Sequence, residues 1–368
     1  MNNEIRVIIS GGGTGGHIFP AVAIANEIKA QKPNAKILFV GALGKMEMEK
    51  VPKSGYEIVG LPIAGFNRSN MLANISFPYK LVKSLFLAIK VLKNFKPDIA
   101  IGVGGFASGP TLRMANLLGI KTLIQEQNSY AGVTNKILSK KAEKVCVAYP
   151  NMEAFFDKEK IVFTGNPVRG DLTKIEISSS QAKKSFGLES DRKTLLVIGG
   201  SLGALSINKG ITNGLKELLN NDLQIIWQTG KTYIDQAREA VDNLQSKRVY
   251  VSDFIYEMDK AYAAADLVVS RAGALSVSEL SLVGKAAILI PYPFAAEDHQ
   301  TQNALSLSSK DAAILVKDAE IADHLVDKVV DLAENATKLG VLSKNIRKFA
   351  KPQAAKEIVA EIFKVTQQ

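Results

Sequence analysis

The segment Ile9–His17, with the sequence ISGGGTGGH, holds five glycines within six residues and ends on one of the chain's three histidines. The run before it, IRVII at residues 5–9, is typical of a buried strand, and IFPAVAIANEIKA at residues 18–30 is typical of a helix. A glycine loop between a strand and a helix directs backbone N–H groups and the helix N-terminus at an anion such as phosphate. A tight turn alone also favours glycine, but five glycines exceed what a turn requires. We therefore expect a phosphate-binding loop within an α/β fold.

The same order recurs nearly 190 residues later, in KTLLVIGGSLGALSINKG at residues 193–210. After each opening, apolar strand-like runs alternate with helix-like runs, which predicts parallel sheets covered on both faces. The predicted strands are 35–40, 97–103, 121–126 and 144–148 in the first half, and 223–228, 248–252, 265–270 and 285–291 in the second. We expect two Rossmann-like domains, 1–165 and 166–352, with a ligand cleft between them at the carboxyl ends of the strands.

The net charge of +10 is confined to the first domain. Residues 1–165 carry 21 Lys and Arg against 11 Asp and Glu, which leaves 25 of each sign in the rest. Such a surface suits an anionic substrate or membrane, or serves solubility alone. Nucleic acid is disfavoured because no RNA-binding or zinc-finger motif is present. The single Cys146 excludes a disulfide framework, and no signal peptide or spanning run is evident, so we expect a soluble cytoplasmic protein.

Gly11, Gly13 and Gly16 also satisfy the G-x-G-x-x-G pattern of a nicotinamide-dinucleotide site. That reading requires an acidic residue at the end of the second strand. Here the strand ends LFVGALG at 38–44, with no acid before Glu47, which disfavours an oxidoreductase. Two further glycine loops, 102–110 and 199–203, follow other apolar strands. They favour two diphosphates, one in a nucleotide-sugar donor and one in a phosphorylated acceptor.

The ordered motifs GGTGGH, GVGGFASGP, QEQN, GNPVR, GGSLGA, RAGALSVSEL and EDHQTQNA resemble the MurG family, the bacterial peptidoglycan N-acetylglucosaminyltransferases. The resemblance implies the GT-B fold, with a C-terminal helix, about 353–368, returning to the N-terminal domain. It implies inverting transfer of GlcNAc from UDP-GlcNAc to the MurNAc 4-hydroxyl of lipid I, undecaprenyl-diphosphoryl-MurNAc-pentapeptide, giving lipid II. It places the chain peripherally on the cytoplasmic face of an anionic membrane, among other cell-wall synthesis proteins. No cofactor is implied, and the sequence has no D-x-D motif for a metal.

Two residues compete for the role of general base in such a transfer. His17 ends the first glycine loop and can take a proton at neutral pH. Its alternative role is to cap the helix or to bind phosphate. Glu126 in QEQN ends another strand on the same side of the sheet. His299 is a weaker candidate, and His324 has the pattern of a helix-surface residue.

Donor and acceptor contacts follow from the loops and from the resemblance. Glu279 closes an S-x-x-E pattern with Ser276, which predicts a helix capping box, whereas the family match implies that it binds the ribose of UDP. The glycine loops of the first domain assign the acceptor diphosphate to Gly13, Gly104, Gly105 and Ser108. The resemblance implies further donor contacts from Thr14, Gly15, Gly16, Asn128, Arg169, Ser201, Ile255, Ala274, Leu275, Ser276, Val277, Ser278 and Gln300.

The segment Pro78–Phe95 is predicted to be a helix that binds the membrane surface. At about 100° per residue, its basic stripe includes two large apolar residues, an arrangement suited to anionic headgroups. The stripe comprises Lys80, Lys83, Phe86, Leu87, Lys90 and Lys93, and residues 65–77 could extend it. The alternative is that Phe86 packs beneath a neighbouring loop. For the whole chain, the alternatives are another GT-B enzyme, such as a glycolipid glycosyltransferase or a UDP-GlcNAc 2-epimerase, or a non-catalytic UDP-sugar-binding regulator.

Overall fold

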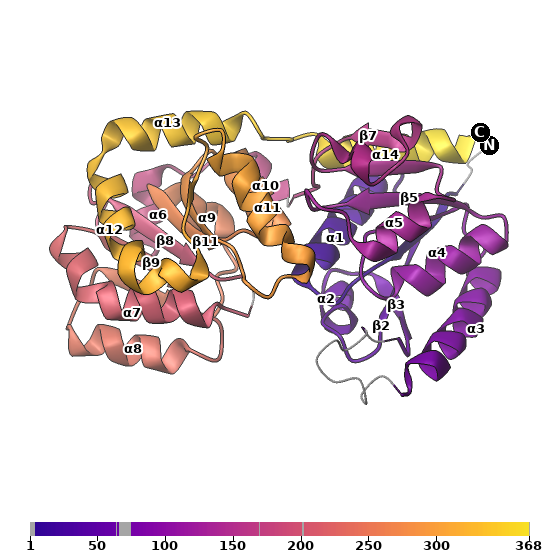
Figure 1. Cartoon of the computed structure of the whole chain (residues 1–368), viewed down its shortest axis with the longest axis horizontal. Helices are drawn as coiled ribbons and strands as arrows, with labels where there is room; N and C mark the ends of the chain where they lie inside the picture. The colour runs from indigo at the N-terminus through magenta and orange to yellow at the C-terminus, as the bar shows by residue number, and fades with distance from the viewer. Residues whose placement is uncertain (1–3, 64, 66–74, 169, 201, 368) are drawn as a thin grey trace. The chain divides into compact units, whose positions relative to one another are not determined.

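The computed structural model of the chain describes residues 4–63, 65, 75–168, 170–200 and 202–367. The chain divides into two compact units, and Figure 1 colours the chain continuously from the N-terminus to the C-terminus. The first unit is Met1–Val168 together with Lys351–Gln368, and the second is Arg169–Ala350. Each unit has its own parallel sheet and its own hydrophobic core.

The first unit is built on seven parallel strands in the order β3-β2-β1-β4-β5-β6-β7. This order starts at β1 and winds outward in both directions, as in a Rossmann sheet. Ser10 pairs with Val40 on one side and with Gly102 on the other, so the loops after β1, β2 and β4 leave from one edge. The strands are β1 (Arg6–Ser10), β2 (Lys36–Ala42), β3 (Glu57–Leu61), β4 (Ile99–Gly102), β5 (Lys121–Glu126), β6 (Lys144–Val147) and β7 (Ile161–Phe163).

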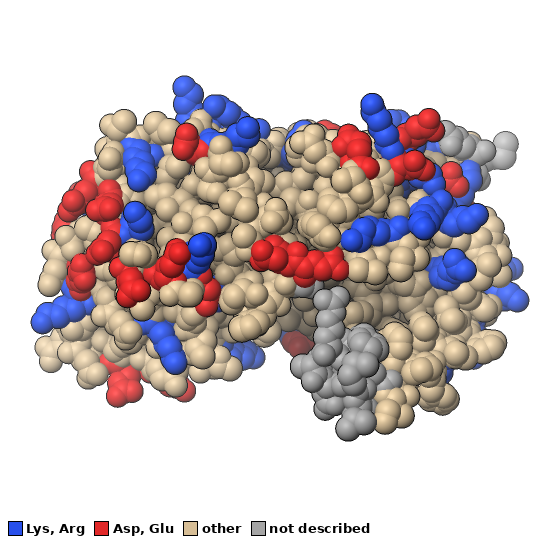
Figure 2. Space-filling view, viewed as in Figure 1, with Lys and Arg blue, Asp and Glu red and all other residues tan. Residues whose placement is uncertain are grey.

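Helices cover both faces of this sheet. They are α1 (Gly15–Gln31), α2 (Glu47–Lys53), α3 (Phe77–Phe95), α4 (Ser108–Leu117), α5 (Val133–Ser139) and α14 (Ala354–Gln367), with 3-10 turns at Met152–Ala154 and Lys158–Lys160. The C-terminal α14 packs against α1, and the buried side chains of both join those of β1 and β4 in one core. On the other face, α3 packs on α4 and α4 on α5. Figure 2 shows Lys and Arg side chains gathered over α5, which carries Lys136.

The second unit repeats this winding with six parallel strands in the order β10-β9-β8-β11-β12-β13. The strands are β8 (Thr194–Ile198), β9 (Gln224–Gln228), β10 (Val249–Ser252), β11 (Leu267–Arg271), β12 (Ala286–Ile290) and β13 (Ile314–Leu315). The helices are α6 (Ser179–Ser185), α7 (Leu205–Asn220), α8 (Ile234–Asn243), α9 (Met258–Ala264), α10 (Ala274–Val283), α11 (His299–Ser308), α12 (Ile321–Glu334) and α13 (Ala336–Arg347). Short 3-10 turns lie at Gly170–Thr173, Ala296–Asp298 and Asp318–Glu320.

The predicted fold class, two Rossmann-like α/β domains with parallel sheets, is confirmed. The apolar runs predicted as strands all lie in the two sheets, and the helix predicted at Pro78–Phe95 is α3. Three strands were not predicted: β3, β7 and β13, each at the edge of its sheet. Among the described residues, no helix has the length and apolar character needed to cross a bilayer.

Candidate active site

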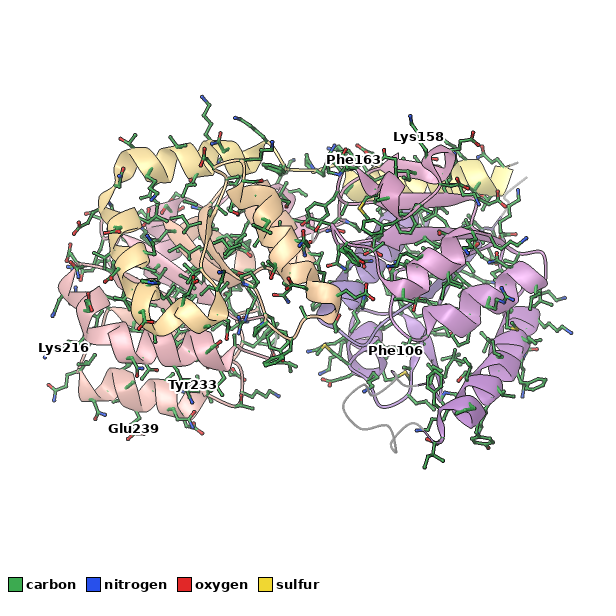
Figure 3. All side chains as sticks on the ribbon, viewed as in Figure 1. Phe106, Lys158, Phe163, Lys216, Tyr233 and Glu239 are labelled. Carbon is green, nitrogen blue, oxygen red and sulfur yellow. The ribbon has the colours of Figure 1, made fainter. Side chains whose placement is uncertain are left out.

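The loop between β1 and α1 packs backbone to backbone against the loop after β4. Gly12 and Gly13 have φ values of 147° and 87°, a region that favours glycine. A Cβ on Gly105 would lie 2.3 Å from the carbonyl oxygen of Gly12, so only glycine fits this approach. Phe106, labelled in Figure 3, follows in the second loop with its ring half exposed. The two predicted phosphate loops of this unit are therefore neighbours in space.

The imidazole of His17 is held by the first glycine loop. Its Nδ1 lies 3.0 Å from the carbonyl oxygen of Gly12 and 3.3 Å from Oγ1 of Thr14. Because a carbonyl only accepts hydrogen bonds, Nδ1 carries the proton, and Nε2 is the basic nitrogen of the neutral ring. A Cβ on Gly104 would lie 2.9 Å from Nε2, and Gly104 has a φ of 89°. Glycine at that position thus makes room for the ring.

Glu47 is a buried residue that the sequence pattern marks only as an acid beyond the second strand. It begins α2 and is 1% exposed. Its Oε2 accepts the N–H of Gly13 at 2.8 Å, and its Oε1 accepts the N–H of Ala42 at 3.0 Å. The Gly13 N–H predicted for the acceptor diphosphate is therefore engaged by a carboxylate in this structure. No local pattern signals this contact, because it joins residues 34 positions apart.

Glu126, the competing base, is surrounded by N–H donors. It is 1% exposed, at the end of β5. Its Oε1 accepts the backbone N–H of Asn128 at 3.0 Å and the side-chain amide of Asn128 at 3.3 Å. Its Oε2 accepts the N–H of Gly132 at 3.1 Å and the amide of Asn135 at 2.8 Å. A carboxylate so held orders the loop before α5, and this geometry favours His17 as the base.

The Ser108 hydroxyl is hydrogen bonded within the loop after β4 and to the end of β1. Ser108 is fully buried, and its Oγ donates toward the carbonyl oxygens of Ser10 at 2.6 Å and Gly104 at 3.0 Å. These bonds fasten the loop after β4 to the end of β1. The arrangement does not support the predicted contact of this hydroxyl with an acceptor diphosphate, because the hydroxyl has no exposed surface.

A network of buried side-chain amides lies at this edge of the sheet, and no sequence pattern indicates it. The side-chain amide of Gln125 donates to Oδ1 of Asn166 at 2.9 Å, and the amide of Asn166 donates to the carbonyl of Gln127 at 3.0 Å. The amide of Gln127 reaches the carbonyl of Val103 at 2.8 Å. The network ties the QEQN and GNPVR motifs to the end of β4, which gives both motifs a structural function.

In the second unit, α10 begins three residues earlier than the predicted capping box requires. Gly273 is the N-cap, with φ −64° and ψ 146°, and Ala274 is the first helical residue. The capping-box prediction for Ser276 and Glu279 is therefore wrong, because Gly273 already occupies that position. Glu279 lies in the second turn, where its Oε2 accepts the hydroxyl of Tyr262 at 3.0 Å. The first-turn N–H groups of α10, those of Ala274 to Ser276, have no carbonyl partner within the helix, and such groups can bind an anion.

Gln228, at the end of β9, joins two loops of this edge and was not singled out from the sequence. Its amide donates to the carbonyl of Gly200 at 3.0 Å, and its Oε1 accepts the N–H of Ile255 at 2.9 Å. The predicted glycine loop and Ile255, a predicted donor contact, are thus held by one side chain. A Cβ on Gly203 would lie 2.0 Å from the carbonyl oxygen of Thr229. The glycine loop after β8 therefore also packs tightly on the segment after β9.

The segment before α11 has an unusual backbone. Glu297 and Asp298 both have a φ of 54°, which residues other than glycine rarely adopt. Gln300, in the first turn of α11, accepts the backbone N–H of Tyr292 at 2.9 Å. Backbone strain of this kind is often found at ligand-binding segments, which agrees with the prediction that Gln300 contacts the donor.

The structure gathers the predicted residues at one edge of each sheet. The first unit places Gly104 and Gly105 beside the first glycine loop and the start of α1, at Thr14, Gly15 and Gly16, and it places Asn128 just after β5. The second unit places Ile255, Gln300 and the start of α10, residues Ala274, Leu275, Ser276, Val277 and Ser278, at its own edge. Arg169 and Ser201 lie outside the described residues, and His324 is exposed on α12 as expected. Within the ranges that the structure describes, no three His, Cys, Asp or Glu side chains cluster as metal ligands.

Comparisons with known proteins cover almost the whole chain. The model described as "Glycosyltransferase family 28 N-terminal domain" matches residues 7–147, and "Glycosyltransferase family 28 C-terminal domain" matches residues 194–358. A UDP-N-acetylglucosamine--N-acetylmuramyl-(pentapeptide) pyrophosphoryl-undecaprenol N-acetylglucosamine transferase of Porphyromonas gingivalis is 57% identical over 100% of this chain and 98% of its own length.

Solved structures support the same relationship. The crystal structure of MurG from Acinetobacter baumannii has a TM-score of 0.78 and 31% identity, covering 98% of this chain and 99% of its own. A UDP-GlcNAc 2-epimerase from Neisseria meningitidis, solved with UDP-GlcNAc, has a TM-score of 0.67, covering 98% of this chain and 100% of its own, but at 15% identity it shares only the fold. Both sheets, both family 28 domains and the full-length similarity agree, and the chain belongs to the MurG family of UDP-N-acetylglucosamine--N-acetylmuramyl-(pentapeptide) pyrophosphoryl-undecaprenol N-acetylglucosamine transferases.

Proposed function

We propose that the chain transfers GlcNAc from UDP-GlcNAc to the MurNAc 4-hydroxyl of lipid I, which gives lipid II for peptidoglycan synthesis. The observation that carries the chemistry is His17, whose Nδ1 is fixed on the Gly12 carbonyl so that Nε2 is basic. The names of the full-length relatives supply the donor and acceptor. Residues 1–165 take the acceptor, and residues 166–352 take the nucleotide sugar.

The reaction is a single displacement with His17 as general base. The 4-hydroxyl oxygen of MurNAc attacks C1 of GlcNAc from the face opposite the diphosphate. The bond from C1 to the phosphate oxygen breaks, and its electron pair leaves with UDP. The hydroxyl proton passes to Nε2 of His17. The new C1–O bond therefore forms with inversion at C1.

The departing UDP needs stabilisation of its negative charge. The N-terminus of α10 and the glycine loop at 199–203 both lie at the carboxyl edge of the second sheet. Backbone N–H groups of a helix N-terminus stabilise a diphosphate without a metal ion. We infer that these two segments hold the leaving group and that the enzyme requires no cofactor.

Two alternatives to this function are a UDP-GlcNAc 2-epimerase, which shares the fold, and a non-catalytic UDP-sugar-binding regulator. Identity of 57% to a named transferase over the full length favours transfer, since the epimerase match reaches only 15%. The deciding experiment incubates the purified chain with UDP-GlcNAc and a water-soluble lipid I analogue. We expect a GlcNAc–MurNAc disaccharide and free UDP in equal amounts. Formation of UDP-ManNAc instead, or binding without turnover, would reject the proposal.

Glu279 is expected to bind the ribose hydroxyls of UDP. Replacing Glu279 with Gln should raise the Kd for UDP about 10- to 100-fold, because hydrogen bonds to a charged group contribute about 1.5–3 kcal/mol. The melting temperature should change little, since Gly273 and not Ser276 caps α10. Calorimetric titration with UDP and thermal unfolding of the same preparation measure both quantities.

A matched control tests whether the Tyr262 contact explains any effect. Tyr262→Phe removes the hydroxyl that donates to Glu279 but leaves the carboxylate in place. We expect UDP affinity within about threefold of wild type for this variant, as for loss of one neutral partner. If Tyr262→Phe weakens UDP binding as much as Glu279→Gln does, Glu279 acts by supporting the fold of the site.

We also propose that α3 docks on the anionic surface of the membrane. Ile75, Tyr79, Val82 and Phe86 follow one another at helical spacing and are exposed by 77%, 68%, 51% and 70%. Because the Phe86 side chain is exposed, the alternative prediction that it packs beneath a neighbouring loop is wrong. Figure 2 shows mainly uncharged atoms over this helix. An exposed apolar stripe beside lysines suits a bilayer interface.

The lysines of α3 supply the electrostatic part of this attraction. Lys83 and Lys90 are exposed, Lys80 and Leu87 are half-buried, and the Nζ of Lys83 lies 5.8 Å from the centre of the Tyr79 ring. Each lysine near an anionic leaflet contributes about 1 kcal/mol. Residues 66–74, which were expected to extend the patch, lie outside the described residues. The proposal therefore rests on α3 and Ile75.

The variant Phe86→Ser with Lys83→Glu and Lys90→Glu should lose most binding to vesicles that contain anionic lipid. Reversing two charges opposes the electrostatic attraction to anionic lipid, and removing Phe86 weakens the apolar contact with the bilayer. Turnover of a water-soluble acceptor should survive. Sedimentation with vesicles and the soluble assay measure the two properties.

A second variant controls for net charge. Lys209→Glu with Lys216→Glu changes the charge equally, at exposed positions of α7 in the other unit; Lys216 is labelled in Figure 3. We expect this variant to bind vesicles nearly as wild type does. Equal loss in both variants would show that overall charge, and not the α3 surface, drives attachment.

A further inference from the structure

The peptide group between Gly12 and Gly13 joins two side chains of opposite chemical character. Its carbonyl oxygen, on Gly12, accepts the Nδ1–H of His17 at 3.0 Å. Its N–H, on Gly13, donates to Oε2 of Glu47 at 2.8 Å. Both atoms belong to one planar amide, so a carboxylate and an imidazole sit at opposite ends of a single dipole. A chain of two hydrogen bonds therefore connects Glu47 to His17 through one peptide group.

Glu47 is built tightly into this position. A Cβ on Gly12 would lie 2.2 Å from its carboxyl carbon, and a Cβ on Gly41 would lie 2.5 Å from its Cγ. Its second oxygen is fixed by the N–H of Ala42 at 3.0 Å. A buried charge is costly unless it is hydrogen bonded, and here two backbone donors meet that need. Two glycines thus make room for a carboxylate behind the loop.

Resting on the proposed role of His17 as base, we propose that Glu47 is a positioning residue that acts on His17 through the Gly12–Gly13 peptide. The carboxylate polarises the amide, and hydrogen bonds in a chain strengthen one another at low local dielectric. The Gly12 oxygen becomes a stronger acceptor, so it holds the proton on Nδ1 and leaves Nε2 basic. When Nε2 takes the acceptor's proton, the same dipole stabilises the imidazolium.

This arrangement performs the task of the aspartate in a Ser-His-Asp triad, with a peptide inserted between the acid and the ring. A second carboxylate on this side of the sheet is that of Glu126, at the end of β5. Its hydrogen bonds go to Asn128, Gly132 and Asn135, which belong to the loop after β5 and to α5. Glu47 is therefore the carboxylate connected to the His17 ring through the first glycine loop.

A double-mutant cycle tests the proposal with the full-length enzyme. Glu47→Gln keeps the shape and removes the charge. We expect kcat to fall about 10- to 100-fold, the usual loss when a residue that orients a functional histidine is replaced, with the KM for UDP-GlcNAc within about threefold of wild type. In a His17→Ala background, the same change should alter kcat by less than about threefold, because Glu47 has lost the ring through which it acts. Glu49→Gln, an exposed position on the same helix, is the matched control.

The protonation of the ring gives a readout that a purely structural role would not move. In ¹⁵N NMR, with His299 and His324 assigned by substitution, His17 should carry its proton on Nδ1 in the wild-type protein. In Glu47→Gln a larger share should move to Nε2. A wild-type His17 protonated on Nε2 overturns the proposal even if the variant fails to fold, and so does an equal loss of kcat in both backgrounds. Unimpaired turnover in His17→Ala alone would instead reject His17 as the base.

Discussion

His17→Ala is expected to lower turnover about 10²- to 10⁴-fold, the usual contribution of a positioned general base. The ring lies on the glycine loop with Nδ1 on the Gly12 carbonyl, so removing it deletes the basic nitrogen without removing a buried core residue. The loss should appear in kcat, because the base acts on the reacting hydroxyl and not on bound UDP. Steady-state kinetics with UDP-GlcNAc and a soluble acceptor measure it.

Substitution of another histidine separates this role from a general effect. His324 is exposed on α12, and His324→Ala should leave kcat unchanged. UDP-GlcNAc affinity of His17→Ala should stay near the wild-type value. Normal turnover in a folded His17→Ala protein would exclude His17 and direct attention to Glu126, whose carboxylate would then have to act despite its four N–H donors.

Much of the fold was predictable because its signals are local. A strand, a glycine loop and a helix in immediate succession, as in residues 5–30 and 193–210, specify a Rossmann opening from neighbouring residues alone. The buried strands of parallel sheets are apolar throughout and were therefore recognised. The edge strands β3, β7 and β13 were not, since Glu57 and Gly60 interrupt the apolar run of β3, and β7 and β13 are only three and two residues long.

The site was only partly predictable, because its supports join residues far apart in the chain. Glu47 bonds a loop 34 residues away, and Gln228 bonds Gly200 and Ile255 across 28 and 27 residues. Side chains that bond a distant backbone leave no periodic pattern in the sequence. The capping box at Ser276 failed for a related reason: the S-x-x-E pattern is genuine, but packing starts α10 at Ala274, so the pattern falls within the helix.

The C-terminal helix completes the core of the first unit. Ile358, Val359, Ile362 and Val365 are each 3% exposed or less and pack with α1 and the sheet. Lys121 also donates to the carbonyl of Val365 at 2.9 Å, near the end of the helix. Just before α14, the Nζ of Lys351 lies 4.0 Å from the centre of the Phe163 ring, which is labelled in Figure 3. A segment that residues 169–350 separate from the rest of its unit is thus integral to that unit.

Removal of residues 354–368 is expected to unfold the first unit. Burying each of the four apolar side chains contributes about 1.5–3 kcal/mol, so their loss costs about 6–12 kcal/mol, comparable with the whole stability of a domain. Cys146 reports the change, because it is the chain's single cysteine and is fully buried in the same core. Burial raises the pKa of its thiol, and the nearby carboxylates Glu361 and Glu357 of α14 raise that pKa further.

The thiol should therefore resist a thiol-specific reagent in the intact protein and react within minutes in the truncated one. In Ile362→Ala, the thiol should react at a rate between those of the intact and the truncated protein. This variant should lose about 2–5 kcal/mol in the free energy of unfolding. Lys356→Ala, at an exposed position of the same helix, should behave as wild type. Protection of Cys146 in the truncated protein, together with an unchanged unfolding transition, would mean that α1 and the sheet form a stable core without α14. The four buried contacts argue against that outcome, because their loss would open the apolar surface of α1 and the sheet to water.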